Sequence, residues 1–197
     1  FTINVSNRKI VQGLINDLNI TEDKQLKVIR AIDKLDKPGF GIRGVEDLLR
    51  KERKDSSGAV TKGANLNDEQ VKQILNFLKI KDLKQLKNNL NNPLSKEGVK
   101  ELEDFFEIIE MGPYKEQVKT NFTIVRGLDY YDGFIIETNL NYKVTNIKGK
   151  EVDIGSICSG GAYSKLISRF KGVDIPGTGI SFGVDRILFA MIQLDQI

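Results

Sequence analysis

The sequence predicts an α+β fold, in which a sheet with flanking helices carries an inserted all-helical domain. The first five residues alternate between apolar and polar side chains, which is the period of a half-buried strand. Residues 21–118 instead show the spacing of amphipathic helices. From Thr120 onward, short apolar runs are separated by glycines, as in strands joined by turns. We therefore expect residues 1–20 and 119–197 to form the sheet part and residues 21–118 to form the inserted domain.

The N-terminal segment is expected to be a strand followed by a helix. Phe1, Ile3 and Val5 occupy one face of the strand. Ser6 is the expected N-cap of the helix, since its hydroxyl can accept a hydrogen bond from the first-turn backbone. The apolar stripe of this helix consists of Ile10, Leu14 and Leu18.

The inserted domain is expected to begin with a helix over residues 21–35. Residues 51–63 are charged, rich in small side chains and without periodicity, which predicts an exposed, mobile loop. The apolar stripe of the first helix consists of Leu26, Ile29, Ile32 and Leu35.

Further helices of this domain are marked by their caps. Asn67 and Gln70 have the spacing of a capping box, which opens a helix. Pro93 is expected to end a short helix, and Ser95 to cap the next one. The apolar side chains of the three helices are Val71, Ile74, Leu75 and Leu78, then Leu83, Leu86 and Leu90, and finally Val99, Leu102, Phe105, Phe106 and Ile109.

The last part of the chain is expected to return to strands and to end on a helix. The helix covers residues 185–194, where apolar side chains recur at helical spacing. The expected strands cover residues 122–125, 134–137, 142–144, 154–158 and 180–184.

The composition excludes several kinds of chemistry. The chain has no histidine and a single cysteine, Cys158, so its 197 residues offer no Ser-His-Asp triad, no histidine-bearing zinc site and no internal disulfide. We expect Cys158 to be a small buried side chain. The net charge of +3 is too small to indicate a nucleic-acid partner. Because the chain has neither a long apolar run nor a signal layout, we expect a cytoplasmic protein. Because it does not begin with methionine, we expect it to be a piece of a longer protein.

The first cluster that could carry chemistry contains Arg126, Tyr130 and Tyr131. An arginine at a strand end offers a rigid fork for a phosphate or carboxylate, and the tyrosines add hydroxyls and flat faces. The alternative is a turn with an ordinary Arg-Asp pair and core aromatic side chains.

The second cluster contains Gly160, Gly161 and Tyr163. Paired glycines after a strand let the backbone approach a ligand closely, and the alternative is a tight turn or bulge.

The third cluster runs from Gly177 to Arg186, where a glycine-lined strand leads into a helix. The Arg186 guanidinium could lie over a purine and meet phosphates. The alternative places Arg186 on a solvated helix face, paired with Asp185. The spacing matches neither the dinucleotide-binding GxGxxG nor the phosphate-binding GxxxxGK[ST] motif.

Three motifs, VRGLDYY, SGGAYSKLI and GTGISFGVDRI, together resemble the second half of the catalytic domain of histidyl-tRNA synthetases. The first is similar to the RGLDYY signature of that family, the second to its AGGRYDGL segment and the third to its motif 3. FTINVSNRK resembles the strand and helix that follow motif 2. The resemblance implies a class II antiparallel sheet, and the helical block lies where the family carries its insertion domain.

The resemblance also implies roles for individual residues. Arg126 would contact the α-phosphate of ATP and the carboxylate of histidine. Tyr131 and Tyr163 would line the pocket for the histidine side chain, with Asp129 and Tyr130 bracing the loop. Glycines would leave room for the ligands, and motif 3 would bind ATP, with Arg186 stacked on adenine. The glycines that would leave this room are Gly160, Gly161 and Gly179. The motif 3 residues that would bind ATP are Gly183 and Arg186.

As a whole, the resemblance implies a histidine-tRNA ligase that uses histidine, ATP with Mg²⁺ as the substrate complex, and tRNA(His) through the insertion domain. It also implies a homodimer when full-length, and neither a protein metal site nor a membrane. The chain departs from the family at Ala162 and Ser164, where arginine and aspartate are usual. Motif 1, motif 2 and the anticodon-binding domain have no counterpart here, so we expect these residues alone to be inactive.

Two other interpretations stay open. One is a non-catalytic, synthetase-like regulatory or sensor module, of the type of the ATP phosphoribosyltransferase regulatory subunit. The other makes residues 21–118 an RNA-contacting module, whose lysines meet phosphates, as opposed to an ordinary solvated surface. The lysines concerned are Lys72, Lys79, Lys81, Lys84 and Lys87.

Overall fold

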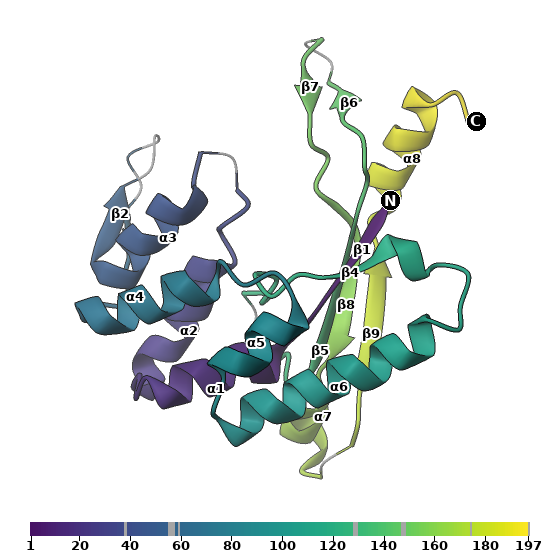
Figure 1. The fold of residues 1–197 in the computed structure, drawn as a ribbon. Helices are drawn as coiled ribbons and strands as arrows, with labels where there is room; N and C mark the ends of the chain where they lie inside the picture. The colour runs from purple at the N-terminus through teal and green to yellow at the C-terminus, as the bar shows by residue number, and fades with distance from the viewer. Residues whose placement is uncertain are drawn as a thin grey trace.

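The computed structural model of the protein describes residues 1–37, 39–54, 58, 60–127, 130–146, 149–173 and 175–196 (Figure 1). Its main sheet has five strands in the order β4-β1-β5-β8-β9. These strands are β4 (Val118–Thr120), β1 (Thr2–Asn7), β5 (Phe134–Asn139), β8 (Ser156–Ala162) and β9 (Thr178–Phe182). The predicted α+β class is confirmed. The sheet is mixed, however, because β1 runs parallel to β4 and antiparallel to β5.

Strand β1, at the start of the sequence, pairs with two strands from the later part of the chain. Ile3 pairs with Val118 on one side and with Thr138 on the other, so the first residues occupy the interior of the sheet. Val5 is fully buried there. The sheet part is therefore made of segments that lie more than a hundred residues apart, with the helices between them.

Helix α1 (Arg8–Asp17) begins one residue later than predicted. Ser6 is not its N-cap, because Ser6 still pairs with Ile135 of β5. Asn7 takes that place, and its Oδ1 accepts a hydrogen bond of 3.0 Å from the backbone amide of Lys9. An asparagine oxygen satisfies a first-turn amide as well as a serine does, so the chemistry of the cap is as expected at a shifted position.

The helical part contains α2 (Glu22–Ile32), α3 (Gly41–Arg50) and α4 (Asp68–Phe77), on the left of Figure 1, and α5 (Leu83–Asn89), near its centre. The capping box is confirmed, since Asn67 and Gln70 each accept from the other's backbone amide. The prediction of a loop over residues 51–63 is wrong at its ends, where β2 (Glu52–Lys54) and β3 (Val60–Lys62) form a hairpin. Backbone pairing stabilises this hairpin without an apolar face, so no periodicity marked it.

Helix α6 (Pro93–Ile109) corrects two expectations. Pro93 begins this helix at its first turn, where a missing amide costs nothing, and Asn92 is the N-cap. Ser95 is fully buried inside the helix, and its hydroxyl donates to the Ile10 carbonyl oxygen at 3.0 Å. Because α6 packs along α1, β1 and β5, its contacts favour grouping it with the sheet; the boundary of the inserted domain at residue 118 stays a prediction.

The crossing of α1 and α6 leaves no room for a side chain at Gly13. A methyl group there would overlap Ser95 Oγ and would lie 2.8 Å from the Ser95 backbone nitrogen. Gly13→Ala should therefore lower the free energy of unfolding by about 1–3 kcal/mol, measured by urea denaturation. Gly112→Ala is the control, since its added methyl would meet only the Ile109 carbonyl at 3.4 Å. Equal stability of Gly13→Ala and the parent would contradict the close crossing.

The C-terminal part differs from the prediction in several places. Residues 122–125 form no strand; Phe122 and Val125 are apolar because they are buried in a loop. The run at 142–144 contributes to a hairpin of β6 (Val144–Thr145) and β7 (Glu151–Val152), at the top of Figure 1. The final helix is confirmed as α8 (Val184–Gln193). Unpredicted elements are β4, the 3-10 helix Lys115–Gln117 and α7 (Ser164–Lys171).

None of the helices in the described ranges is both long enough and apolar enough to cross a bilayer.

Candidate functional site

Arg126 lies at the end of the buried loop that precedes β5. Its Nη1 is 3.3 Å from Glu137 Oε2 on β5, and 28% of its side chain is exposed. Its Nε is buried and has no hydrogen-bond partner among the described residues. The Arg126 backbone has a φ of +51°, a left-handed conformation that costs an arginine about 1 kcal/mol or more. The guanidinium is therefore aimed by its surroundings and keeps donor capacity for a further acceptor.

Arg8, the first residue of α1, forms hydrogen bonds to the backbone of this loop. It is buried, and its Nη1 donates to the carbonyl oxygens of Val125 at 2.5 Å and of Arg126 at 2.9 Å. These two bonds fix the strained backbone of Arg126 in place. Sequence reasoning missed both Arg8 and Glu137, because each reaches Arg126 from a distant segment. The only signal in the sequence was the place of Arg8, directly after the strand predicted at the N-terminus.

The three tyrosines predicted for the pocket come together. The rings of Tyr130 and Tyr131 are 4.7 Å apart, and those of Tyr130 and Tyr163 are 6.3 Å apart and nearly perpendicular. Burial raises the pKa of the Tyr131 phenol, helped by a hydrogen bond to Tyr130, and the Arg126 guanidinium acts in the opposite direction. Tyr131 is thus a neutral hydroxyl close to Arg126. Asp129, expected to brace this loop, lies outside the described residues.

The predicted glycines lie inside the strands and not in a turn. Gly160 of β8 pairs with Ile180 of β9, and a methyl group at Gly160 would overlap the Gly179 carbonyl and lie 2.7 Å from Ile180 Cα. Gly161 and Gly179 flank the tyrosines: their added methyls would lie 3.0 Å from the Tyr131 ring and 3.1 Å from the Tyr163 ring, respectively. These glycines accommodate protein neighbours, and the room they would leave for a ligand stays a prediction.

Arg186 occupies a separate place, at the start of α8. Its Nη1 donates to the Ser156 carbonyl oxygen at 2.5 Å, and the described residues show no ion pair between Arg186 and Asp185. Gly183 precedes α8 as its N-cap residue. A cavity of about 400 Å³ is lined by both Arg186 and Glu137. Glu137 therefore connects the two predicted arginines, since it pairs with Arg126 and faces the cavity of Arg186.

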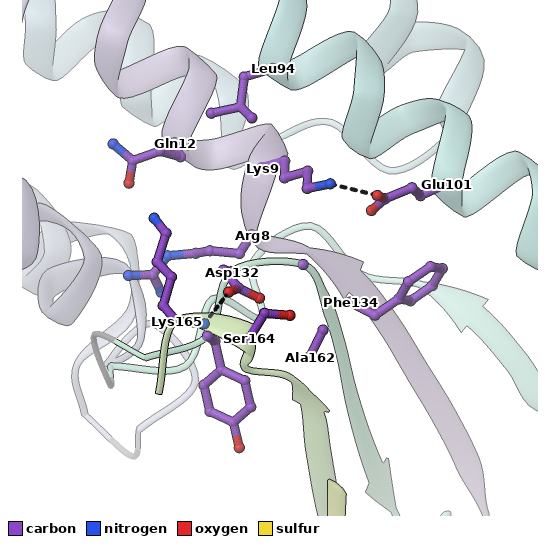
Figure 2. A pocket seen from close by; sticks show the side chains of 12 residues that line it. Arg8, Lys9, Gln12, Leu94, Glu101, Asp132, Phe134, Ala162, Ser164 and Lys165 are labelled. Carbon is purple, nitrogen blue, oxygen red and sulfur yellow. Dashed lines mark hydrogen bonds and ion pairs between the residues drawn. The ribbon is translucent and has the colours of Figure 1, made fainter. Parts of the chain in front are cut away.

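A larger cavity, of about 680 Å³, is lined by residues of α1, α6 and the start of α7 (Figure 2). Tyr131, Ala162 and Ser164 line it, so the two departures from the family pattern both face this space. Asp132 accepts a hydrogen bond of 2.8 Å from the Lys165 backbone amide, in the first turn of α7. Asp132 was not among the predicted site residues, and it fixes the junction between the tyrosine loop and α7.

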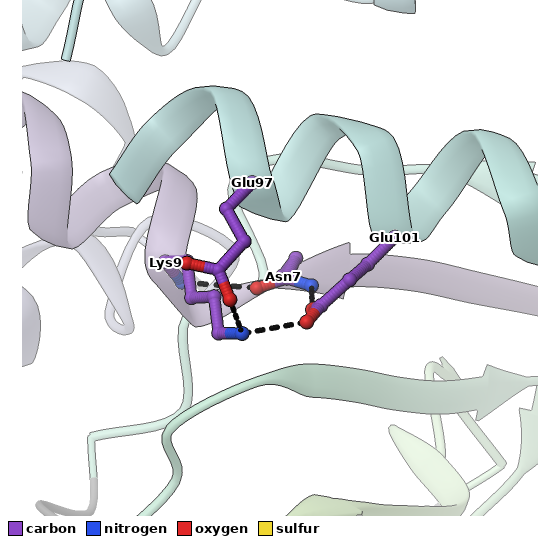
Figure 3. Close-up of polar contacts among 4 residues, drawn as sticks. All are labelled: Asn7, Lys9, Glu97 and Glu101. Carbon is purple, nitrogen blue, oxygen red and sulfur yellow. Dashed lines mark hydrogen bonds and ion pairs between the residues drawn. The ribbon is translucent and has the colours of Figure 1, made fainter. Parts of the chain in front are cut away.

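Lys9 joins α1 to α6 at the rim of this cavity (Figure 3). Its Nζ lies 2.7 Å from Glu97 Oε1 and 2.5 Å from Glu101 Oε1, and Asn7 Nδ2 donates to Glu101 at 2.5 Å. Burial lowers the pKa of Lys9, but hydrogen bonds and attraction from Glu101 and Glu97 outweigh it, so the pKa lies above its ordinary 10.5. Because Asn7 and Lys9 stand on either side of Arg8, the network holds the backbone of Arg8 in place.

Lys9→Met should lower the free energy of unfolding at pH 7 by about 1–2 kcal/mol. Because folding raises the pKa of Lys9, this stabilisation is fully present below pH 10.5 and is lost as the pH rises through the higher folded pKa. Urea denaturation of both proteins at pH 7 and pH 11 checks this. Lys96→Met on α6 is the control, because Lys96 is exposed and forms no ion pair within the described residues. A deficit that does not shrink at pH 11 would count against the assignment.

The lysines of the proposed RNA-contacting surface are not all free. Lys87 pairs with Glu103 of α6, and Lys79 lies 3.5 Å from the Asn76 side-chain oxygen. Lys81 lines a shallow cavity with Lys119.

Cys158 is buried, as expected, and burial raises the pKa of its thiol. Within the described residues, no group of three or more acidic or cysteine side chains could hold a metal ion.

Solved structures with this fold define the class of the protein. The chain matches the histidyl-tRNA synthetase of Nostoc sp. PCC 7120 with a TM-score of 0.74 and 30% identity, over 100% of this chain and 43% of that one. A structure described as an ATP phosphoribosyltransferase regulatory subunit/histidyl-tRNA synthetase from Bacillus halodurans has a TM-score of 0.69, over 98% of this chain and 44% of that one. Its 18% identity shows a shared fold alone. The fold is that of part of an aminoacyl-tRNA synthetase.

Residues 1–187 match the family described as histidyl-tRNA synthetase, and the chain belongs to this family. It is 76% identical over 197 residues to the histidine–tRNA ligase of Pelagibacter ubique, covering 100% of the chain and 42% of that protein. It is 40% identical over 207 residues to the ligase of Rhizobium rhizogenes, covering 100% of the chain and 41% of that protein. The chain spans less than half the length of these curated relatives. The predicted resemblance to the histidyl-tRNA synthetase family is confirmed, and the assignment of the chain to the second half of the catalytic domain stays a prediction.

Proposed function

We propose that this chain is part of the catalytic domain of a histidine-tRNA ligase, which attaches histidine to tRNA(His) at the expense of ATP. The observation that supports this best is the Arg126 guanidinium, aimed by Glu137 and Arg8 next to Tyr131. The 76% identity to the Pelagibacter ubique ligase supports the choice of substrates. In the complete protein we expect a homodimer in the cytoplasm, where its tRNA substrate would be charged.

In the proposed first step, a carboxylate oxygen of histidine attacks the α-phosphorus of ATP, and pyrophosphate leaves. Arg126 bridges the carboxylate and the α-phosphate, and stabilises the negative charge that builds up on the equatorial oxygens. Mg²⁺ enters with ATP as part of the substrate complex. The step needs positioning and charge neutralisation and no side-chain base, so a chain without histidine is suited to it.

The remaining residues position the substrates. Tyr131 and Tyr163 line the pocket for the imidazole of the substrate, and Tyr130 packs between them. A neutral Tyr131 hydroxyl can donate to an imidazole nitrogen or accept from it. Motif 3 binds ATP: Gly183 lets the backbone approach the nucleotide, and Arg186 stacks on adenine and reaches the γ-phosphate. The glycines that complete the pocket wall are Gly160, Gly161 and Gly179.

We expect residues 1–197 alone to give no histidine-dependent pyrophosphate exchange, because Arg126 and Arg186 would then be the only ATP-binding arginines available. The complete gene product should show robust exchange under the same conditions. The measurement uses radiolabelled pyrophosphate, with and without histidine. Strong exchange by the isolated residues would refute the proposal that they form half of a site.

The same assay separates the ligase from the synthetase-like regulatory module. A regulatory module should show no histidine-dependent exchange even as the complete gene product. The shared fold with the Bacillus halodurans structure is compatible with both functions, since fold alone does not determine the reaction.

A further inference from the structure

One buried arginine is bonded to both ends of the segment that carries Arg126 and the tyrosines, residues 126–133. Arg8 stands where β1 passes into α1, and 6% of it is exposed. Its Nη1 donates to the carbonyl oxygens of Val125 and Arg126, where the segment begins. Its backbone amide donates to the Gly133 carbonyl oxygen at 2.8 Å, where the segment ends. Both ends of the segment are therefore fixed to one residue.

The two ends are held by different kinds of bond. The tyrosine end is held by backbone groups: the Arg8 amide donates to Gly133, and the Asp132 amide donates to the Ala162 carbonyl oxygen at 3.1 Å. The Arg126 end is held by the Arg8 guanidinium, whose charge strengthens its hydrogen bonds to the carbonyl oxygens. A substitution at position 8 thus releases the Arg126 end and leaves the tyrosine end in place.

The Arg126 end depends on this support. Its backbone φ of +51° is unfavourable for a residue with a side chain. The guanidinium of Arg126 is itself held by one ion pair, to Glu137, and its Nε has no partner among the described residues. Because the backbone sets the direction of the side chain, a shift of this backbone moves the guanidinium away from the α-phosphate to which we assign it. A misplacement of about 1 Å in a catalytic group can lower a rate about a hundredfold.

We propose that Arg8 is a positioning residue for the adenylation step, which holds the backbone of Arg126 and thereby directs its guanidinium. Arg8 acts through Arg126 and not through a substrate. A side chain that only filled the space would serve equally well without a charge, whereas the two carbonyl oxygens need a donor. The inference rests on the proposed function.

The test replaces Arg8 by methionine in the complete gene product, which keeps much of the length of the side chain and removes every donor. The kcat of histidine-dependent pyrophosphate exchange should fall by about 10–100-fold. The KM for histidine should change less than about twofold, because backbone bonds still hold the tyrosine end. Arg8→Lys should recover kcat to within about threefold of the parent, since one ammonium can donate to both carbonyl oxygens as Nη1 does.

A double-mutant cycle shows whether Arg8 acts through Arg126. In an Arg126→Gln background, Arg8→Met should lower kcat by less than about twofold further, because the guanidinium that it directs is already absent. General damage to the fold would instead lower kcat by the same factor in both backgrounds. Should Arg8→Met not fold, Arg8→Gln takes its place in every measurement, since its amide can still donate to one carbonyl oxygen.

Two further measurements separate positioning from stability. Ser95→Ala removes a buried hydrogen bond between α6 and the Ile10 carbonyl oxygen of α1. It should lower the thermal unfolding temperature and keep the exchange rate of the parent. Hydrogen–deuterium exchange followed by mass spectrometry needs no ligand. In Arg8→Met, peptides covering residues 122–127 should exchange faster than in the parent, and peptides covering residues 130–136 should exchange at the parent rate.

The outcomes distinguish this inference from the proposed function. If the parent shows no histidine-dependent pyrophosphate exchange, the proposed function fails, and hydrogen exchange alone then decides whether Arg8 holds the Arg126 end. With an active parent, the proposed function stands, and three results overturn the inference. They are a kcat of Arg8→Met within about threefold of the parent, an equal fall in both backgrounds of the cycle, and unchanged hydrogen exchange at residues 122–127.

Discussion

Replacement of Arg126 by glutamine in the complete gene product should lower histidine-dependent pyrophosphate exchange by about 10²–10³-fold, as expected when a preorganised donor to a developing negative charge is removed. Glutamine keeps much of the length and polarity of the side chain but carries no charge. The pair with Glu137 would also be lost, leaving a half-buried carboxylate next to the proposed α-phosphate site. We expect the fall mainly in kcat, because the charge that Arg126 stabilises grows in the transition state.

Two variants make this result interpretable. Arg43→Gln removes an exposed arginine from α3 and should leave the exchange rate at the parent level. Glu137→Gln keeps Arg126 charged but removes the carboxylate that orients its guanidinium. The exchange rate should therefore fall by a smaller factor than in Arg126→Gln. An exchange rate for Arg126→Gln within threefold of the parent, with an unchanged thermal unfolding temperature, would show that Arg126 does not carry the step.

Gly160→Ala should have the largest effect on folding, lowering the free energy of unfolding by about 3 kcal/mol. The added methyl group would overlap the Gly179 carbonyl oxygen and approach Ile180 Cα to 2.7 Å, and both are backbone atoms of the paired strand. A side chain can rotate away from such an overlap, whereas a hydrogen-bonded strand has to move as a whole. The variant therefore separates β9 from β8, and with it the motif that carries Arg186.

Urea denaturation of the parent, Gly160→Ala and Ser159→Ala measures this effect. Ser159 is the neighbour in β8, and its backbone pairing with Ser181 does not depend on its hydroxyl. Ser159→Ala should therefore change the free energy of unfolding by less than about 0.5 kcal/mol. A loss below 1 kcal/mol for Gly160→Ala would mean that the two strands pair less closely than described.

Local signals in the sequence were reliable where one short segment determines its own structure. The capping box of Asn67 and Gln70 is an example, since both partners lie within one helical turn. The apolar spacing of α8 is another. The prediction that Pro93 ends a helix is wrong, because Pro93 begins α6. A proline is compatible both with the residue after one helix and with the first turn of the next, so the sequence alone does not distinguish the two.

The candidate site was predictable only in part. Arg126 and the tyrosines stand in one recognisable motif, so they could be named before the fold was known. Arg8 and Glu137 come from β1–α1 and β5, and no local pattern relates either of them to Arg126. The apolar run at 122–125 was mistaken for a strand, because burial in a loop and burial in a sheet require the same side chains.

The central place of β1 in the sheet has a kinetic consequence. This strand is the first part of the chain described here to be synthesised, yet its partners, β4 and β5, begin at residues 118 and 134. At ordinary rates of translation, β1 would wait on the order of ten seconds for them. The helices between would form early from local contacts, while β1 stayed without the two strands with which it pairs. Completion of the sheet is thus expected to be the slow step of folding, and the window in which a holding chaperone would matter most.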